Sequence, residues 1–321
     1  MIVDILAAIG RRSQFGLIAG LLCGILFPVL AAGLREHLTE LIVALLFFAS
    51  LRIDPRALGT LRLAFAHDVP IVIALQLALP LFVGLALWGS GWTGPFATML
   101  ALLAAASPIS GSPPIAQLLG QSGAVALRLL LWGTLLLPIT SFAPLQLLFG
   151  PDSGVNVIGA SLRLAAIILL SVFGAGLLRR TVLGALSPRA DLALGGASTI
   201  LLAVFVIALM DAVQPALLAT PIKLAGIFAA TCLMCFAPQA AAALLYRKFA
   251  GARGEAGAAG AVGVAAGNRN MALFLAALPA AQTEPLMILV GCYQIPMYLT
   301  PIVMRPLYRA LSKSTPGAKD S

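Results

Sequence analysis

The sequence predicts an all-α polytopic membrane protein of about ten transmembrane helices, arranged as two inverted five-helix repeats. Composition is the first observation: 61% of the 321 residues are hydrophobic, 10% are charged, and the mean hydropathy is +1.04. Soluble chains are about 45–50% apolar and about 25% charged, so most of this chain needs lipid as its solvent. The other two observations are ten apolar runs and two matching interruptions within them.

The ten apolar runs are each read as one spanning segment, since a bilayer core takes roughly 20 apolar residues per helix. The segment Met1–Arg12 is short and amphipathic, and no small-residue cleavage site follows it, so an interfacial helix is expected there rather than a signal peptide. The predicted spans are Phe15–Leu34, Leu38–Leu51, Val69–Leu87, Pro95–Leu119, Ala124–Phe149, Val157–Leu178, Leu192–Met210, Ile222–Leu245, Ala256–Leu278 and Leu286–Leu307.

The basic residues alternate between the two sets of connections. One set carries fifteen basic residues and the opposite set carries three. By the positive-inside rule, both termini are therefore expected in the cytoplasm, and the multi-pass protein is expected in the inner or plasma membrane. The net charge of +9 is thereby explained without a nucleic-acid partner. The fifteen are Arg11, Arg12, Arg52, Arg56, Arg62, Arg179, Arg180, Arg189, Arg247, Lys248, Arg253, Arg305, Arg309, Lys313 and Lys319, and the three are Arg35, Arg163 and Lys223.

The halves 1–149 and 150–321 repeat several features at equivalent places. Span 3 carries Gln76 with Pro80, and span 8 carries Pro238 with Gln239. Because five is odd, the second half enters the membrane from the opposite side. Proline and glycine also kink ordinary membrane helices, but paired breaks in an inverted repeat are typical of a secondary transporter with its site at the midplane. The break residues are Pro108, Gly111, Pro113 and Pro114 in span 4, and Gly267 in span 9.

Three stretches resemble the bile acid:sodium symporter (BASS) family along essentially the whole chain. They are Phe47–Pro55 at the end of span 2, Gln76–Leu81 with its glutamine and proline in span 3, and Gly267–Leu273 in span 9. The resemblance implies a panel domain of spans 1, 2, 6 and 7 and a core domain of spans 3–5 and 8–10. It also implies that helices 4 and 9 are unwound where they cross, and that the protein carries a bile acid-like anion.

The chain departs from the family at the sodium ligands. Aligned on Asn270, the family's span 9 glutamate is Ala265 here, and its glutamine is Arg269. All eleven carboxylates fall at span ends, loops or termini, so the oxygen ligands that a hard cation needs are not expected at depth. No metal and no other cofactor is expected, although sodium stays possible. The carboxylates are Asp4, Glu36, Glu40, Asp54, Asp68, Asp152, Asp191, Asp211, Glu255, Glu284 and Asp320.

Two arginines lie within the predicted core. Arg269 falls in the middle of span 9, where a charge is costly and marks a functional site, and Arg128 lies about a turn into span 5. In the family register Arg128 falls near a serine of the first sodium site, and snorkelling to the headgroups is its alternative. With the positive ends of half-helices, the two arginines predict a pocket for an organic anion. The expected substrate-binding residues are Arg269, Asn268, Asn270, Ser110, Ser112, Arg128 and Gln76.

Other functions are less well supported by the residues. A sodium-coupled symporter with a rearranged cation site stays open, as does export of arsenite or another anion on the same fold. Arsenite carriers place a cysteine in the helix 4 crossing, where this chain has Ser110–Ile115. An enzyme is not expected, because no nucleophile with a base lies at depth. An anion channel also stays open, and the oligomeric state is monomer or homodimer.

Overall fold

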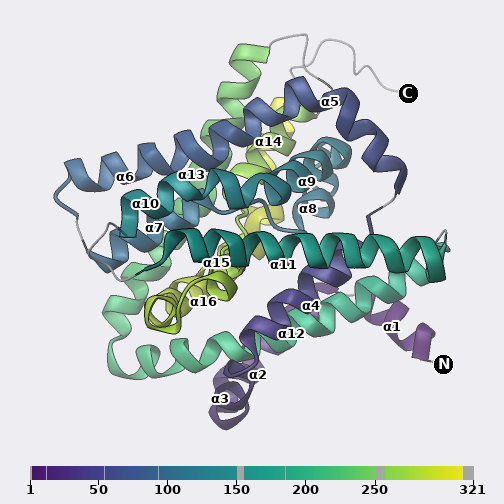
Figure 1. Cartoon of the computed structure of the whole chain (residues 1–321). Helices are drawn as coiled ribbons and strands as arrows, with labels where there is room; N and C mark the ends of the chain where they lie inside the picture. The colour runs from purple at the N-terminus through teal and green to yellow at the C-terminus, as the bar shows by residue number, and fades with distance from the viewer. Residues whose placement is uncertain are drawn as a thin grey trace. The chain divides into compact units, whose positions relative to one another are not determined.

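The computed structural model describes residues 2–11, 13–53, 55–92, 94–149, 155–184, 186–250, 255 and 257–313. The chain is followed from the N-terminal α1 to the C-terminal helix in Figure 1. Some residues of the sequence predictions lie outside the described residues, namely Arg12, Asp54, Asp152, Arg253, Lys319 and Asp320, and so do the side chains of Arg56, Arg62, Glu284 and Lys313.

Helices make up nearly all of the described chain. Two extended residues of this described part pair through an isolated antiparallel β-bridge. Among the described residues, six helices are long and apolar enough to cross a membrane. An all-α polytopic membrane protein is therefore confirmed, whereas the count of ten spans and the inverted repeat stay predictions. The six are Ala64–Gly89, Gly123–Thr140, Val157–Leu183, Pro188–Ala219, Pro221–Ala250 and Leu286–Val303.

The four other predicted spans are not long continuous helices. The first is bent by 105° between Leu26 and Pro28, and it makes a seventh span if the bent pair counts as one. The second is a helix of 14 residues, about 21 Å long at 1.5 Å per residue, against a hydrocarbon core of about 30 Å. The fourth and ninth predicted spans are each interrupted in the middle.

The chain divides into two compact units, and unit 1 comprises Met1–Gly59, Ile158–Gly226 and Ala272–Cys292. Its longest helix, α12, lies alongside α1, α2, α3 and α4 (Figure 1). The helices wholly or almost wholly in unit 1 are α1 (Ile2–Arg11), α2 (Ser13–Leu26), α3 (Pro28–Arg35), α4 (Leu38–Leu51), α11 (Val157–Leu178), the π-helical η3 (Arg179–Leu183), α12 (Pro188–Ala219) and α15 (Ala272–Ala277).

Glycines let α1 approach α12 at backbone distance. A Cβ on Gly196 would overlap the carbonyl oxygen of Leu6, and one on Gly10 would overlap that of Leu192. The start of α12 is well defined, since Ser187 caps it through a hydrogen bond from the Ala190 amide of 3.2 Å. The N-terminal helix α1 thus packs directly on the longest helix of its unit.

Unit 2 comprises Thr60–Val157, Ile227–Met271 and Tyr293–Ser321. Its helices are the π-helical η1 (Ala74–Ala78), α6 (Leu79–Gly89), α7 (Pro95–Ala105), α8 (Ser112–Leu118), α9 (Gly123–Thr140), α10 (Phe142–Phe149), α14 (Ala258–Gly267) and α17 (Arg305–Lys313). Three helices, α5 (Pro55–Ile73), α13 (Pro221–Ala250) and α16 (Ala280–Val303), contribute to both units. The panel and core domains stay predictions.

Candidate functional site

The two interruptions face each other within unit 2. The isolated bridge joins Pro108 to Arg269. Its hydrogen bonds run from the Ile109 amide to the Asn268 carbonyl, at 2.9 Å, and from the Asn270 amide to the Ser107 carbonyl, at 2.7 Å. The chain between α7 and α8 therefore pairs with the chain after α14, and each break satisfies backbone groups that the other one frees.

Local sequence explains why the chain is extended at these places. Ala106 has an extended conformation that ends α7, as expected of a residue near a proline, and Pro108 has no amide hydrogen to continue a helix. Pro113 and Pro114 do not break a helix but lie in the first turn of α8, where amide hydrogens have no partner anyway. In α14, a Cβ on Gly267 would overlap a backbone carbonyl of α13, so a glycine is needed for this close approach.

Arg269 is 2% exposed and binds three backbone carbonyls from three parts of unit 2. Its Nε donates to the Ala266 carbonyl at 2.8 Å and its Nη1 to the Ala106 carbonyl at 2.9 Å. Its Nη2 donates to the Leu75 carbonyl at 2.6 Å. One guanidinium thus ties η1 to the ends of α7 and α14.

Each of these carbonyls lacks a hydrogen-bond donor within its own helix. The Leu79 amide bonds to the Ala74 carbonyl in the π-helical turn, and Pro80 has no hydrogen to donate, so the Leu75 carbonyl has no partner further along the helix. Ala106 and Ala266 lie at the C-terminal ends of α7 and α14, where carbonyls are unpaired and the helix dipole is negative. These two helix ends stabilise a buried cation without a carboxylate.

Further buried side chains hold the second break in place. The Tyr293 hydroxyl accepts a hydrogen bond from the Arg269 amide at 3.1 Å and donates to the Gly267 carbonyl. Asn268 donates to the Val264 carbonyl at 3.1 Å and accepts from the Thr300 hydroxyl at 3.3 Å. Nothing in the sequence pattern had singled out Tyr293 or Thr300, because a tyrosine and a threonine in an apolar run carry no motif.

Buried glutamines form two similar pairs in unit 2. Gln76 accepts from the Thr140 hydroxyl at 2.7 Å and donates to the Gly133 carbonyl at 2.7 Å. Gln239 donates to the Thr300 hydroxyl at 3.1 Å. In each predicted repeat, the glutamine of the third span therefore bonds to a threonine of the fifth span.

Arg128 belongs to a separate polar cluster in unit 2. Its Nε donates to Asp68 at 2.7 Å and its Nη2 to Glu255 at 2.6 Å. Asp68 is fully buried and Arg128 is 7% exposed. Arg128, which the sequence analysis placed in an anion pocket or at the headgroups, is thus paired with two carboxylates. The Nδ1 of His67 also lies 2.9 Å from Asp68.

The predicted site residues fall into three groups. Asn268, Arg269 and Asn270 lie together at the paired breaks with buried Pro108, while Ser110 is exposed at the turn before α8. Ser112 is buried there, and its hydroxyl and that of Ser107 have no hydrogen-bond partner among the described residues. Gln76 is in the glutamine–threonine pair, and Arg128 is in the polar cluster. Whether any of them binds substrate stays a prediction.

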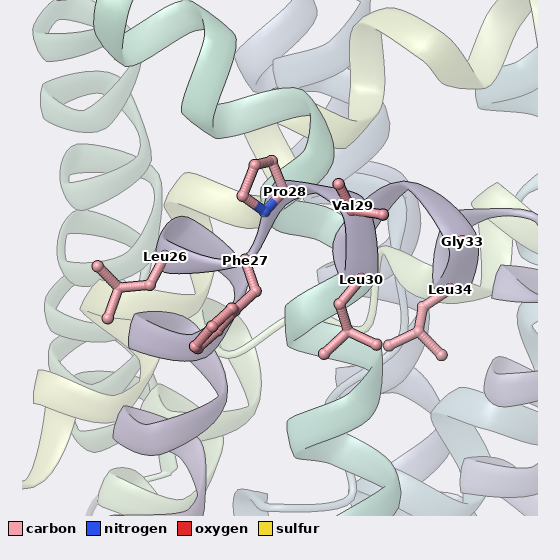
Figure 2. A pocket seen from close by; sticks show the side chains of 7 residues that line it. All are labelled: Leu26, Phe27, Pro28, Val29, Leu30, Gly33 and Leu34. Carbon is pink, nitrogen blue, oxygen red and sulfur yellow. The ribbon is translucent and has the colours of Figure 1, made fainter.

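Two surface hollows lie in unit 1, and neither resembles the predicted anion pocket. A crease of about 610 Å³ occurs where α2 bends into α3 at Pro28, and its side chains are all apolar (Figure 2). It is lined by Leu26, Phe27, Pro28, Val29, Leu30, Gly33 and Leu34. A groove of about 890 Å³ runs between α1, α2 and α12, with Arg11 as its one charged lining residue. Val29 at the crease is 87% exposed, as expected of a side chain that faces lipid.

The fold and the paired breaks define a polytopic helical membrane protein with broken helices. Comparison with models of protein families gave no match, and comparison with curated proteins found no relative. The resemblance to the BASS family therefore rests on the motifs in the sequence and stays a prediction.

Proposed function

We propose that the chain is a secondary transporter that moves an organic anion across the membrane by alternating access, without the two sodium sites of the BASS family. A bile acid-like molecule or a small carboxylate is the substrate class. The protein lies in the inner or plasma membrane with both termini in the cytoplasm, which rests on the alternation of basic residues.

The pairing of the two breaks is the observation that carries this proposal. Extended backbone inside an apolar helical protein is tolerated only where it is buried in protein or lines a cavity. Discontinuous helices that meet in this way hold the substrate site in many secondary transporters. The two glutamine–threonine pairs support the same conclusion, because each links the third and fifth spans of its predicted repeat, although the threonine donates in one pair and the glutamine in the other.

The charge at the breaks favours an anion. In the described part of the chain, Arg269 has no acid among its hydrogen-bond partners, and carbonyls engage three of the five N–H groups of its guanidinium. The two remaining N–H groups, on Nη1 and Nη2, and the unpartnered hydroxyls of Ser107 and Ser112 are donors for a carboxylate. Because Arg269 is 2% exposed, the described state is closed around it, and the substrate reaches it in another state of the transport cycle.

A binding screen with the purified full-length protein tests the proposal. Cholate, taurocholate, benzoate and lactate are each titrated while the thermal unfolding temperature is recorded, in sodium chloride and in potassium chloride of equal ionic strength. Ligands that bind the folded state raise this temperature in a concentration-dependent way. We expect stabilisation by at least one carboxylate in both salts.

The controls define the outcomes that would contradict the proposal. Choline and glucose, a cation and a neutral molecule, should give no shift. Stabilisation by choline but by none of the anions would refute an anion carrier. An anion effect that needs sodium would instead support the symporter with a rearranged cation site, for which the free oxygens of Ser107 and Ser112 are candidates.

A further inference from the structure

The helix α17 shares a core with α8 and α14, the two half-helices that adjoin the breaks. Its side chains Tyr308 and Leu311 are 0% and 6% exposed, whereas Arg305 and Arg309 of the same helix are exposed. Tyr308 and Leu311 belong to one apolar core with residues of α8 and α14. Because α8 begins after the first break and α14 ends at the second, α17 is packed with the helices of both breaks.

A buried glutamine joins α17 to the end of α8. Gln121 lies in the turn between α8 and α9 and is 7% exposed. Its Nε2 donates to the Ser312 hydroxyl at 2.8 Å and to the Tyr308 carbonyl at 3.4 Å. Beside it, the Ser122 amide donates at 3.2 Å to the carbonyl of Gly257, the residue before α14. The ends of the half-helices that lie away from the breaks are therefore held together beside α17.

A chain of three buried hydrogen bonds runs from α17 to the second break. The Tyr308 hydroxyl donates to Gln239 Oε1 at 3.0 Å. The amide nitrogen of Gln239 donates to the Thr300 hydroxyl at 3.1 Å, and this hydroxyl lies 3.3 Å from its acceptor Asn268 Oδ1. All four side chains are 0% exposed. Water therefore does not compete for these groups, and each one depends on its neighbour in the chain.

The chain has one direction because its first donor is a hydroxyl and its first acceptor is a carbonyl oxygen. Gln239 accepts from Tyr308 through Oε1, so its NH2 group faces Thr300. The Thr300 hydroxyl then accepts from Gln239 and turns its own hydrogen toward Asn268 Oδ1 and the Pro296 carbonyl, each at 3.3 Å. The amide of Asn268 at the second break is thereby held in one orientation.

Glycines of α14 make room for the two side chains that dock on it. A Cβ on Gly263 would lie 2.7 Å from the Tyr308 hydroxyl, closer than a carbon atom can approach. A Cβ on Gly260 would overlap the side chain of Gln121. The surface of α14 is thus shaped to receive the tyrosine and the glutamine, which distinguishes this docking from a loose apolar contact.

From these contacts we infer that Tyr308 is a positioning residue for anion transport, and that α17 is a clamp on the two half-helices. Tyr308 acts through Gln239 and Thr300 on Asn268, which is one of the expected substrate-binding residues. Without the tyrosine hydroxyl, the amide of Gln239 is free to turn over, and Asn268 then loses the donor that orients it. The inference rests on the proposed function for the transport step only, because the clamp is tested without substrate.

Thiol labelling of the purified full-length protein tests the clamp. Cys235 is 0% exposed and its Sγ accepts from Gln239 at 3.4 Å, so its reaction with N-ethylmaleimide reports opening of the hydrogen-bond chain. Peptide mapping by mass spectrometry separates Cys235 from the other cysteines. Tyr308→Phe should raise the labelling rate of Cys235 about fivefold, as expected from one lost buried hydrogen bond. Cys292, which is 4% exposed, should keep its wild-type rate.

The controls separate the clamp from a general loosening of the fold. Tyr298→Phe is the matched variant, since Tyr298 is a tyrosine of α16 outside the hydrogen-bond chain, and it should leave both labelling rates unchanged. An equal rise at Cys292 in Tyr308→Phe, or no rise at Cys235, would overturn the clamp.

A second pair of variants tests whether the hydrogen bonds act as one chain. Thr300→Val removes the last donor and should also speed the labelling of Cys235, whereas Thr300→Ser keeps the hydroxyl and should resemble the wild type. The double variant of Tyr308→Phe and Thr300→Val should label no faster than the faster single variant, because both changes break the same chain. Effects that multiply would overturn the chain.

Cholate uptake into proteoliposomes tests the positioning role. Tyr308→Phe should raise the KM for cholate about fivefold with little change in Vmax, because it weakens binding at Asn268 in a protein that stays folded. A lower Vmax at an unchanged KM is the result of a merely structural role, and it would overturn the positioning while the proposed function stands. Faster labelling of Cys235 in Tyr308→Phe, in a protein that carries no anion, would refute the proposed function and leave the clamp standing.

Discussion

Replacement of Arg269 by glutamine tests whether the paired breaks depend on this one guanidinium. The change removes a buried cation at the C-terminal ends of α7 and α14 and takes away donors to the carbonyls of Leu75, Ala106 and Ala266. A glutamine amide has two N–H groups on one nitrogen and a shorter reach, so at least one carbonyl is left unpaired.

The expected loss can be worked out from these contacts. An unsatisfied buried polar group costs about 1–3 kcal/mol, and the lost attraction between a cation and a helix end is up to about 2 kcal/mol in a buried geometry. The free energy of unfolding should therefore fall by about 2–4 kcal/mol. At roughly 2 °C per kcal/mol for a large domain, the unfolding temperature should fall by about 4–8 °C.

The assay is thermal unfolding of the purified full-length protein in detergent, with anion binding measured beside it. Arg163→Gln is the matched control, because Arg163 is an exposed arginine of α11, and it should change stability by less than about 0.5 kcal/mol. Arg269→Lys should recover only part of the loss, since an ammonium is a point charge and cannot reproduce the fork of a guanidinium. An Arg269→Gln protein as stable as the wild type would refute the reasoning.

Three further predictions concern packing and ions. Arg128→Gln should destabilise the protein by about 3–5 kcal/mol because Asp68 keeps a buried, less compensated charge; adding Asp68→Asn should recover part of that loss in the same unfolding assay. Gly196→Ala should cost about 1–3 kcal/mol because the new Cβ overlaps α1, whereas Gly176→Ala, with nothing within 4 Å, should be neutral or stabilising in thermal unfolding. Anion affinity measured by titration should differ less than tenfold between sodium and potassium, and a larger difference, above about 1.4 kcal/mol, would show a surviving cation site.

Sequence patterns could predict the breaks and the importance of Arg269. Pro108 and the run Gly267–Asn270 interrupt apolar segments, and the rules for backbone groups in lipid require such interruptions to be buried. A charge in the middle of an apolar run is likewise visible in any sequence. In the structure, helices end at Ala105 and at Gly267, and the guanidinium of Arg269 donates to backbone carbonyls.

The polar cluster could not be predicted in the same way. Asp68 lies in a polar connection by composition, but it is fully buried, and its carboxylate accepts from Arg128, which is 60 positions away in the chain. Contacts between residues 60 or more positions apart depend on how helices pack, which a single sequence does not reveal. The unpaired carbonyl of Leu75 could not be predicted either. Pro80 in the sequence indicates that one amide donor is missing, but it does not indicate the π-helical turn that precedes it.

Uptake of radiolabelled cholate into proteoliposomes that contain the purified protein, with potassium as the only alkali cation, tests the central claim most directly. The account predicts saturable uptake above that of protein-free vesicles, and its loss when unlabelled cholate is added in excess. It also predicts the same rate, within a factor of two, when sodium replaces potassium. Saturable uptake that occurs only with sodium would contradict the claim that this transporter works without the two sodium sites of the family it resembles.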